Sequence, residues 1–562
     1  MLAVVGESGS GKSVMCLALM NLLSKAARVV QGSVLFSPDG KGTINLLGMP
    51  EKEFRSYRGN QLGMIFQEPM TSLNPVMTCG KQLVEPLIQH KKLNRGQARK
   101  EALLLFEKVQ LPEPEIIFKR YPHQLSGGQK QRVMIAMAIS CNPSILICDE
   151  PTTALDVRVQ KTILDLLKDL RRSENIGMIF ITHDLGLVAD MADRALVMLR
   201  GRLVESGPVN KLFTDPQHPY TRGLLLCRPA LHVKGKRLPV VSDFLESKQD
   251  EAAENFKEIS ELGRVSDPPP LKSNPEPPSH QPANEQKSGQ PVGKVREVLL
   301  EVKGLHLRYS SGKTWLGREK NWVDAIRDIN FEVFRGETLG LVGESGSGKT
   351  TLGRALLGLN KPAAGSILYS GVDLLTMRKA TLLAFRRNIQ IVFQDPYSSL
   401  NPRMMAGAAI SEPLKVHDTL NRRERKERVM ELLQNVDLKP EHFNRYPFAF
   451  SGGQRQRIVI ARALALDPGF VVFDESVSAL DVSVQAQVLN LINDLKKNLG
   501  FTAVFISHDL SVIRYLCDRV MVMEKGRIVE SGDVETVYLN PQTVYTQSLI
   551  EAIPGKSVKP KA

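Results

Sequence analysis

The chain has 562 residues, of which 42% are hydrophobic and 24% are charged, and its formal net charge is +14. This composition excludes collagen-like, wholly disordered and disulfide-rich proteins, and the length suggests three or four ordinary domains or two large ones. No uninterrupted apolar run approaches the ~20 residues that a transmembrane helix needs.

The location and partners suggested by composition follow from the first residues and from the charge. Met1–Gly6 contains neither the basic region nor the cleavage site of a signal peptide, so we expect a cytosolic chain or one peripheral to a membrane. A basic balance can indicate nucleic acid or anionic lipid, but at this charged fraction it is more typical of a solvated surface. The six cysteines lack metal-ligand spacing, so we expect reduced, mostly buried thiols.

The first predicted element is a phosphate-binding loop between a strand and a helix. An apolar strand, Leu2–Val5, precedes Gly6–Ser13, and a helical pattern follows over Val14–Leu23. Glycine allows backbone N–H groups to curl around phosphate oxygens, and the helix N-terminus adds partial positive charge. Lys12 would meet the β- and γ-phosphates, and Ser13 would offer its hydroxyl to Mg²⁺. The predicted phosphate cradle comprises Gly6, Ser8, Gly9, Gly11, Lys12 and Ser13.

The next element with chemistry is an apolar strand that ends in two carboxylates. Residues 144–150 run from Ser144 to Asp149 and Glu150. In open α/β sheets ligands bind at the carboxyl ends of strands, so Asp149 suits a Mg²⁺-linked role and Glu150 could orient or deprotonate a water. The alternative, an acidic turn after a buried strand, is disfavoured behind a phosphate-binding loop.

The composition changes in the middle of the chain. Residues 267–291 hold eight prolines and no aromatic residue. Such a segment cannot bury enough apolar surface to offset its ordering entropy, so we interpret residues 231–296 as a flexible, partly extended linker. Residues 251–262 could form a short helix within it.

The second half repeats the first in the same order. A strand, Leu339–Val342, precedes Gly343–Thr350, and a helical pattern follows over Thr351–Leu359. Residues 469–475 again end in an Asp–Glu pair. Two copies of one α/β domain explain the repeat, so we predict domains at 1–230 and 297–553, a tail at 554–562, and ATP with Mg²⁺ at both sites. The residues predicted to bind in the second copy are Gly343, Ser345, Gly346, Gly348, Lys349, Thr350, Asp474 and Glu475.

Several further motifs resemble those of ATP-binding cassette (ABC) ATPases. Leu125–Gln129 and Phe450–Gln454 resemble the family signature, and Ala154–Asp156 and Ala479–Asp481 resemble the loop that crosses the cassette interface. Single glutamines and histidines stand in the family positions of the glutamine loop and the switch, namely Gln67, Gln394, His183 and His508. The resemblance covers nearly all of the chain except the linker. It implies for each copy a mostly parallel sheet with a helical subdomain that carries the signature.

In this family two cassettes pair head to tail, so that the signature of one closes over the nucleotide of the other. The resemblance implies two hydrolytic sites, with Glu150, His183, Glu475 and His508 as catalytic residues. It assigns Mg²⁺ to Ser13, Gln67, Asp149, Thr350, Gln394 and Asp474. Site one would combine Lys12, Ser13, Gln67, Asp149, Glu150 and His183 with Ser451, Gly453 and Gln454, and site two would combine Lys349, Thr350, Gln394, Asp474, Glu475 and His508 with Ser126, Gly128 and Gln129.

The two copies differ at their starts. The second carries residues 298–337 before its phosphate-binding strand, including Tyr309, a candidate ring for stacking on adenine. The first copy starts directly in that strand and lacks the corresponding β segment, which leads us to expect a truncated or misassigned start.

Two classes of cassette protein compete. Residues 68–75 and 395–402 resemble the peptide-importer branch, and Asp215–Thr221 resembles the end motif of dipeptide, oligopeptide and nickel importers, with a weaker copy at Asn540–Thr546. Fused pairs of this kind resemble the ATP-binding proteins of glutathione import and microcin-type peptide import. The alternative is a soluble, ribosome-associated translation factor with tandem cassettes, which the proline-rich linker disfavours.

The importer resemblance implies where the chain acts and with what. We expect a peripheral protein on the cytoplasmic face of the inner membrane, with two integral permease subunits and a solute-binding protein as partners. Membrane contact would be made through the permease alone, and no nucleic acid is expected.

Overall fold

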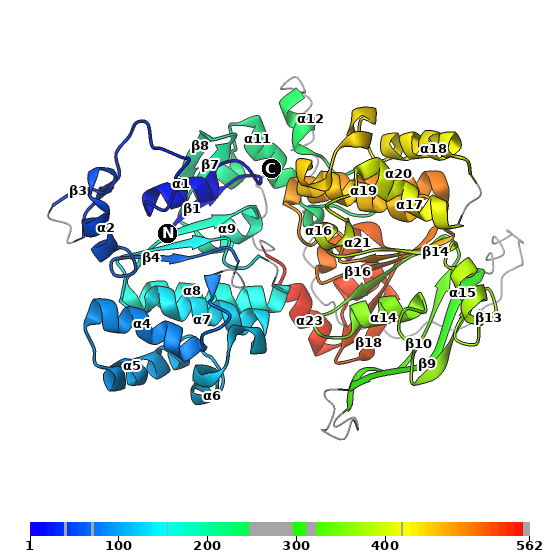
Figure 1. Ribbon diagram of the computed structural model, residues 1–562, viewed down its shortest axis with the longest axis horizontal. Coiled ribbons are helices and arrows are strands. Elements are labelled where there is room, and N and C mark those ends of the chain that lie inside the picture. The colour runs from blue at the N-terminus through cyan, green and yellow to red at the C-terminus, as the bar shows by residue number, and fades with distance from the viewer. Residues whose placement is uncertain are drawn as a thin grey trace, which may run out of the picture.

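The computed structural model describes residues 1–38, 42–68, 72–153, 155–246, 296–310, 322–417 and 420–554. Two α/β units lie side by side, the first coloured blue to teal and the second green to red (Figure 1). The predicted linker from residue 247 to 295, with its possible short helix, and the tail from residue 555 lie outside the described residues.

Each unit is built on a six-stranded sheet with the same strand order, β4-β5-β6-β1-β7-β8 in the first and β14-β15-β16-β11-β17-β18 in the second. The last pair of each sheet is antiparallel and the other neighbours are parallel. The prediction of two mostly parallel sheets is therefore confirmed. The strands are β1 (Leu2–Val5), β4 (Leu62–Ile65), β5 (Ile145–Asp149), β6 (Gly177–Thr182), β7 (Arg194–Leu199) and β8 (Arg202–Pro208), and β11 (Thr338–Val342), β14 (Ile389–Val392), β15 (Phe470–Asp474), β16 (Thr502–Ser507), β17 (Arg519–Glu524) and β18 (Arg527–Asp533).

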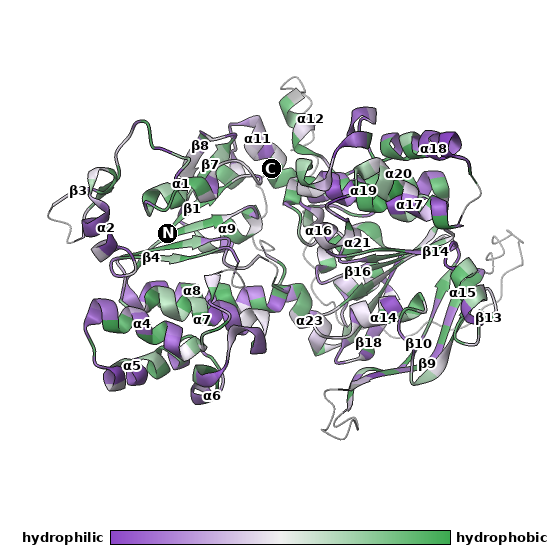
Figure 2. Ribbon diagram, viewed as in Figure 1, coloured by the Kyte–Doolittle hydropathy of each residue, from purple (hydrophilic) through white to green (hydrophobic). Residues whose placement is uncertain are grey.

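Helices cover these sheets, because parallel strands are apolar on both faces. Every residue of β11 and β15 is buried, and Figure 2 shows green strands inside helices with purple outer faces. The covering helices are α1 (Lys12–Leu19), α8 (Val157–Glu174), α9 (Leu185–Met191), α10 (Val209–Thr214) and α11 (Pro219–Leu226), and α14 (Lys349–Leu356), α20 (Val482–Leu499), α21 (Leu510–Leu516), α22 (Val534–Leu539) and α23 (Val544–Glu551). A further helix, α15 (Lys379–Phe385), has no buried residue, and its Phe385 ring packs against Tyr369 outside this sheet.

A helical subdomain follows β4 in the first unit and β14 in the second. Its last long helix begins at the signature, where Ser126 and Ser451 cap the helices with their side chains. The subdomains comprise α4 (Cys79–Lys91), α5 (Arg95–Lys108), α6 (Pro114–Lys119), η2 (Pro122–Gln124) and α7 (Gly127–Ile139), and α16 (Pro396–Ser399), α17 (Ala406–His417), α18 (Arg422–Asn435), η4 (Pro440–Asn444), η5 (Pro447–Ala449) and α19 (Gly452–Leu464).

The units differ in a second, antiparallel sheet. The second unit has four strands in the order β10-β9-β12-β13, namely β10 (Trp322–Phe334), β9 (Val298–Ser310), β12 (Ala364–Tyr369) and β13 (Val372–Asp373). The described part of the first unit holds only the two-stranded counterpart β2 (Leu35–Phe36) and β3 (Ile44–Asn45), followed by η1 (Leu46–Gly48) and α2 (Glu51–Tyr57). Among the described residues of the first unit, no strands match β9 and β10.

The start of the predicted linker is ordered, and the prediction of a flexible segment from residue 231 is wrong for residues 231–245. After η3 (Pro229–Leu231) the chain reaches α12 (Val241–Glu246). Leu238 is fully buried, and the side chain of Asn490 bonds both of its backbone polar groups. The cause is that Leu238, Val240, Val241 and Phe244 bury apolar surface, which the proline-rich part cannot do.

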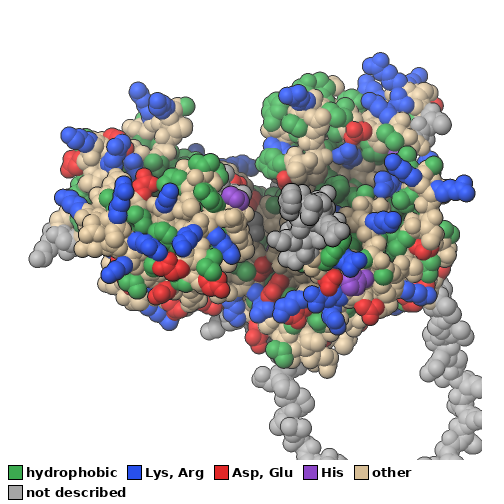
Figure 3. Space-filling view, turned by 60° about the horizontal axis from the view of Figure 1, so that its bottom comes forward, with side chains coloured by type: hydrophobic (Ala, Val, Ile, Leu, Met, Phe, Trp, Pro, Cys, Tyr) green, Lys and Arg blue, Asp and Glu red, His purple; other side chains and the backbone are tan. Residues whose placement is uncertain are grey.

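The surface carries charges of both signs. Figure 3 shows Lys and Arg side chains spread over both units and interspersed with acidic ones on this face. None of the helices in the described part of the chain is long and apolar enough to cross a membrane. All six cysteines are buried free thiols, as expected.

Candidate functional site

The phosphate-binding loop of the first unit joins β1 to α1. Gly11 caps α1 at φ 100°, in the left-handed region that favours glycine. The Nζ atom of Lys12 donates to the carbonyl oxygens of Gly6 at 2.7 Å and Glu7 at 2.9 Å. Burial lowers the pKa of Lys12 below its ordinary value. The loop therefore holds a buried cation at the N-terminus of a helix, which suits an anionic ligand.

A hydroxyl and a carboxylate meet beside this loop. Ser13 Oγ donates to Asp149 Oδ1 at 3.0 Å, which brings the first turn of α1 to the end of β5. Burial raises the pKa of Asp149 above its ordinary value, with a smaller contribution from the neighbouring Glu150. Hydroxyl and carboxylate oxygens are ligands that Mg²⁺ accepts, so the donor set fits this ion.

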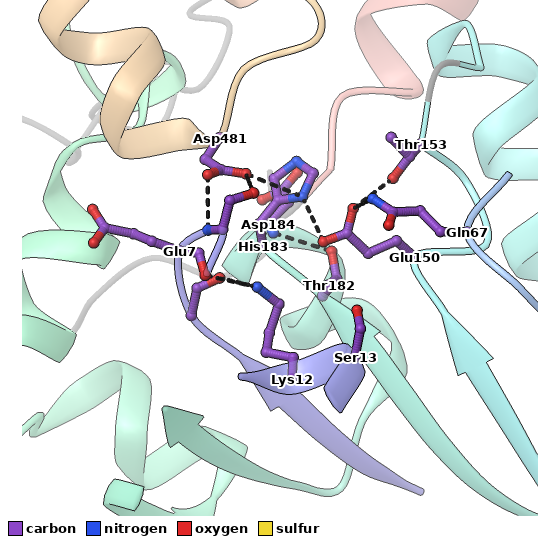
Figure 4. Close-up of polar contacts among 12 residues, drawn as sticks. Glu7, Lys12, Ser13, Gln67, Glu150, Thr153, Thr182, His183, Asp184 and Asp481 are labelled. Atoms are coloured by element: carbon purple, nitrogen blue, oxygen red, sulfur yellow. Dashed lines mark hydrogen bonds and ion pairs between the residues drawn. The ribbon is translucent and has the colours of Figure 1, made fainter. Parts of the chain in front are cut away.

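Glu150 is the hub of the first site (Figure 4). Its carboxylate accepts hydrogen bonds from Gln67 Nε2 and Thr153 Oγ1, each at 3.0 Å, and lies 3.2 Å from His183 Nδ1. Its backbone has φ 45°, an uncommon conformation for a non-glycine residue. At this turn the Glu150 carboxylate points toward His183 (Figure 4).

The pKa values of this pair reflect their contact. Burial alone would raise the pKa of Glu150, but the hydrogen bond and charge of His183 outweigh it, so the pKa lies below its ordinary value. Burial alone would lower the pKa of His183, but Glu150 raises it above its ordinary value. The pair is thus stabilised as carboxylate and imidazolium. Gln67 lies against Glu150, whereas Ser13 lies against Asp149.

The second site repeats these contacts. Lys349 Nζ donates to the carbonyl oxygens of Gly343 and Glu344, each at 2.8 Å. Thr350 Oγ1 donates to Asp474 Oδ1 at 2.9 Å. Glu475 Oε2 accepts from Gln394 Nε2 at 2.8 Å and lies 3.6 Å from His508 Nδ1. Glu475 has φ 46°. Lys349 additionally lies 3.7 Å from Glu475. The structure therefore assembles the same set twice: a lysine, a glutamine, an aspartate, a glutamate, a histidine and a hydroxyl residue, which is Ser13 in the first site and Thr350 in the second.

The second unit reaches into the first site through the loop before α20. Asp481 accepts hydrogen bonds from the backbone N–H of Ser8 at 2.8 Å and its hydroxyl at 3.0 Å, and lies 3.8 Å from His183 (Figure 4). Next to it, the Ser483 hydroxyl donates to the Glu7 carboxylate. In the other direction, Arg158 Nη1 of the first unit lies 2.5 Å from Glu344 Oε1.

The signature residues lie elsewhere. Ser451, Gly453 and Gln454 line a cavity of about 460 Å³ between α19, α20 and the ordered residues 237–242. Ser126 and Gln129 bond one another in a capping box at the start of α7, where Gly128 packs close to Val159. The predicted contact of each signature with the phosphate-binding loop of the opposite unit remains a prediction. Among the described residues, Asp481 and Ser483 of the second unit contact the first loop, and Arg158 of the first unit contacts the second loop.

Tyr309 lies on β9 with 45% of its surface exposed. Its hydroxyl accepts a hydrogen bond at 3.0 Å from Asn360, a few residues after α14. The ring is therefore accessible near the phosphate-binding helix, and stacking on adenine remains a prediction.

Sequence reasoning did not identify all residues of the site. Thr153 donates a hydrogen bond to Glu150. One tyrosine of each end motif contacts a phosphate-binding loop: Tyr220 contacts Glu7, and Tyr545 contacts Glu344. The sequence could have indicated these tyrosines, because both end motifs contain one although the second motif is the weaker copy.

Comparisons with known proteins show which proteins the chain is similar to. The ABC transporter family model matches residues 1–153 and 326–478, and a model described as the oligopeptide/dipeptide transporter C-terminal region matches residues 204–250. The chain is similar to the glutathione import ATP-binding protein GsiA of Pectobacterium atrosepticum, 46% identical over 98% of this chain and 84% of the relative. It is 47% identical to the same-named protein of Escherichia coli strain K12, with the same shares covered. A bacterial ABC transporter cassette solved as a dimer matches 42% of this chain and 99% of its own, with 28% identity and a TM-score of 0.38.

Proposed function

The chain belongs to the ATPases of the ABC transporter family, and we propose that it powers the uptake of peptides, glutathione or similarly small ones, through a membrane permease. The relatives named for glutathione import and the oligopeptide-type C-terminal region support this substrate class. The observation that carries the ATPase role is the pair of matched sites, in which Glu150 and Glu475 are each held by a glutamine and a histidine.

The residues of each site have different roles in ATP hydrolysis, which their positions determine. Lys12 and Lys349 leave the loop carbonyls and bind the terminal phosphates. Ser13 with Asp149, and Thr350 with Asp474, would hold Mg²⁺, which neutralises charge on the phosphates when bound. Glu150 and Glu475 orient or deprotonate the attacking water, and His183 and His508 hold these carboxylates in place.

The contacts between the units support a coupled motion. Asp481 contacts both Ser8 of the phosphate-binding loop and His183, so a nucleotide that reshapes this loop changes a contact between the units. A ligand shifts a conformational equilibrium only by its differential affinity for two states, and a γ-phosphate gripped from both units supplies that difference. Two permease subunits, a solute-binding protein and a place on the cytoplasmic face of the membrane are part of this proposal.

A tagged pull-down from detergent-solubilised cells, followed by mass spectrometry, tests the proposal. Co-purification of two integral membrane permeases supports the importer, and a solute-binding protein among the partners would identify the transported peptide. Recovery of ribosomal proteins without permeases would favour the translation-factor alternative instead. The match of residues 204–250 to an oligopeptide-type region speaks against that alternative.

A further inference from the structure

The end motif of each unit contacts the phosphate-binding loop of the same unit. The backbone N–H of Glu7 donates to the Tyr220 hydroxyl at 2.9 Å, and that of Glu344 donates to the Tyr545 hydroxyl at 3.0 Å. Tyr220 lies in α11 and is fully buried, and Tyr545 lies in α23. These contacts join residues 213 and 201 positions apart in sequence, so both units form the same contact between distant segments.

The contacted peptide lies at the base of the loop. The preceding Gly6 is so crowded that an added Cβ would lie 2.3 Å from the Met198 carbonyl oxygen, so the backbone there has little freedom. The Glu7 carbonyl oxygen accepts a hydrogen bond from Lys12 Nζ, while its N–H group donates to the tyrosine. When the lysine turns toward a phosphate, two restraints on this peptide are left: the Ser10 N–H, which donates to the Glu7 carbonyl oxygen at 3.1 Å, and the tyrosine hydroxyl, which is the side-chain restraint.

The glutamate side chains extend to the opposite unit. The Glu7 carboxylate accepts from Ser483, and the Glu344 carboxylate pairs with Arg158, whose guanidinium also lies 5.7 Å from the centre of the Tyr545 ring. The loop glutamate is thus the junction of three parts: the end motif, the phosphate-binding lysine and the opposite unit. Burial raises the pKa of both phenols, that of Tyr545 to about 12, so both hydroxyls keep their protons at neutral pH.

We propose that Tyr220 and Tyr545 are positioning residues that hold the base of each phosphate-binding loop in its nucleotide-receiving shape. The oligopeptide-type end motif then sets nucleotide affinity in the same unit, in addition to any contact with partners. The inference rests on the ATPase activity of the family and adds residues that do not themselves touch the phosphates.

The test replaces Tyr220 and Tyr545 by Phe, singly and together, which keeps the buried ring and removes the hydrogen-bond acceptor. We expect the KM for ATP and the Kd for ADP to rise about two- to tenfold, as the loss of one net hydrogen bond predicts, with kcat within twofold of wild type. Tyr538→Phe is the matched control, because this tyrosine of α22 contacts Arg514 instead of a phosphate-binding loop. It should leave KM, Kd and kcat unchanged.

Two results would overturn the inference: unchanged KM and Kd in the double variant, or equal losses in the Tyr538→Phe control. If Tyr220→Phe fails to fold because this residue is fully buried, Tyr545→Phe alone decides, since its ring is partly exposed. The Kd for ADP needs no turnover, so a wild-type chain without hydrolysis would contradict the ATPase role while the binding comparison still tests the tyrosines.

Discussion

Arg158 and Ser483 occupy the same position in the two units, yet only Arg158 brings a charge to the opposite phosphate-binding loop. Each is the second residue of its helix, α8 or α20. Arg158 forms an ion pair with Glu344, whereas Ser483 donates a hydroxyl to Glu7. The two contacts between the units are therefore made from equivalent helix positions and differ in charge, so the stabilities of variants at the two positions should depend differently on salt concentration.

Replacing Arg158 by Gln should weaken the contact between the units in a salt-dependent way. The side chains of Arg158 and Glu344 are 44% and 33% exposed, so the pair contributes about 0–1 kcal/mol. Thermal unfolding should show a Tm lower by at most about 2–4 °C at low salt, because 1 kcal/mol shifts a domain of ~150–250 residues by that amount. The difference should vanish near ~1 M salt, where the Debye length is ~3 Å. Ser483→Ala is the control, and an equal salt dependence in that variant would contradict the assignment.

Replacing Glu150 or Glu475 by Gln tests whether both sites hydrolyse ATP. The double variant should lose about 10²–10⁴-fold in kcat, which is the usual contribution of a positioned general base. Each single variant should lose half of the activity if the sites act independently and more if they are coupled. An unchanged rate in either single variant would show that its site is not hydrolytic. Glu107→Gln on exposed α5 controls for the substitution itself.

Replacing Asp149 or Asp474 by Asn should weaken Mg²⁺ binding. Each carboxylate accepts a hydrogen bond from the hydroxyl of Ser13 or Thr350, and groups that support a metal ligand typically contribute 10–100-fold in metal affinity. We expect the Mg²⁺ concentration for half-maximal hydrolysis to rise by about that factor. Thr350→Ser keeps the hydroxyl and should behave as wild type. A Mg²⁺ requirement unchanged in Asp474→Asn would exclude this carboxylate from the metal site.

Replacing Asn490 by Ala should release residues 231–245 from the second unit. The side chain of Asn490 accepts from the Leu238 N–H at 3.0 Å and donates to its carbonyl oxygen at 2.8 Å. Two lost hydrogen bonds of about 0.5–1.5 kcal/mol each predict trypsin cleavage at Lys236 and Arg237 that is ~10-fold faster or more. Lys497→Ala, on the exposed end of α20, should leave the rate unchanged. Equal cleavage rates in the two variants would mean that Asn490 does not hold the segment.

The ion pair between Glu150 and His183 predicts a pH dependence of the first site. The pKa of His183 is raised by Glu150 above its ordinary value of 6.5, and the pKa of Glu150 lies below its ordinary value of 4.5. The stability that this pair contributes is therefore full between pH 4.5 and 6.5, and it is lost as pH rises through the raised pKa of His183 or falls through the lowered pKa of Glu150. In Glu150→Gln the burial effect and the charges of Asp481 and Asp184 remain without the Glu150 carboxylate, so the pKa of His183 should fall relative to wild type. Histidine-selective NMR, assigned with a His183→Gln variant, measures both values. A pKa that does not fall in Glu150→Gln would refute the pairing.

Much of the fold follows from local sequence pattern. The apolar runs at Leu2–Val5 and Leu339–Val342 are strands flanked by parallel neighbours, and the glycine-rich loops end at the helices predicted after them. The prediction of a flexible linker is wrong for residues 231–245, which pack against the second unit. Their burial depends on Asn490 and on Tyr515, whose hydroxyl donates to the Lys236 carbonyl oxygen. Composition describes a segment by itself and carries no information on a distant surface that covers it.

The sequence by itself determined the duplication and the chemistry of each site. Glycine spacing, a lysine and hydroxyl at a helix start, and carboxylates at the end of a strand are local features, and each requires particular residue types. Only the tertiary structure decided which residues contact the phosphate-binding loops from a distance: Asp481 against Ser8 and Arg158 against Glu344 between the units, and Tyr220 and Tyr545 against the loop glutamates within each unit. The physical reason is that these contacts join segments roughly 190–470 residues apart along the chain through single hydrogen bonds and ion pairs, each worth about 1 kcal/mol, which leave no periodic pattern in the sequence.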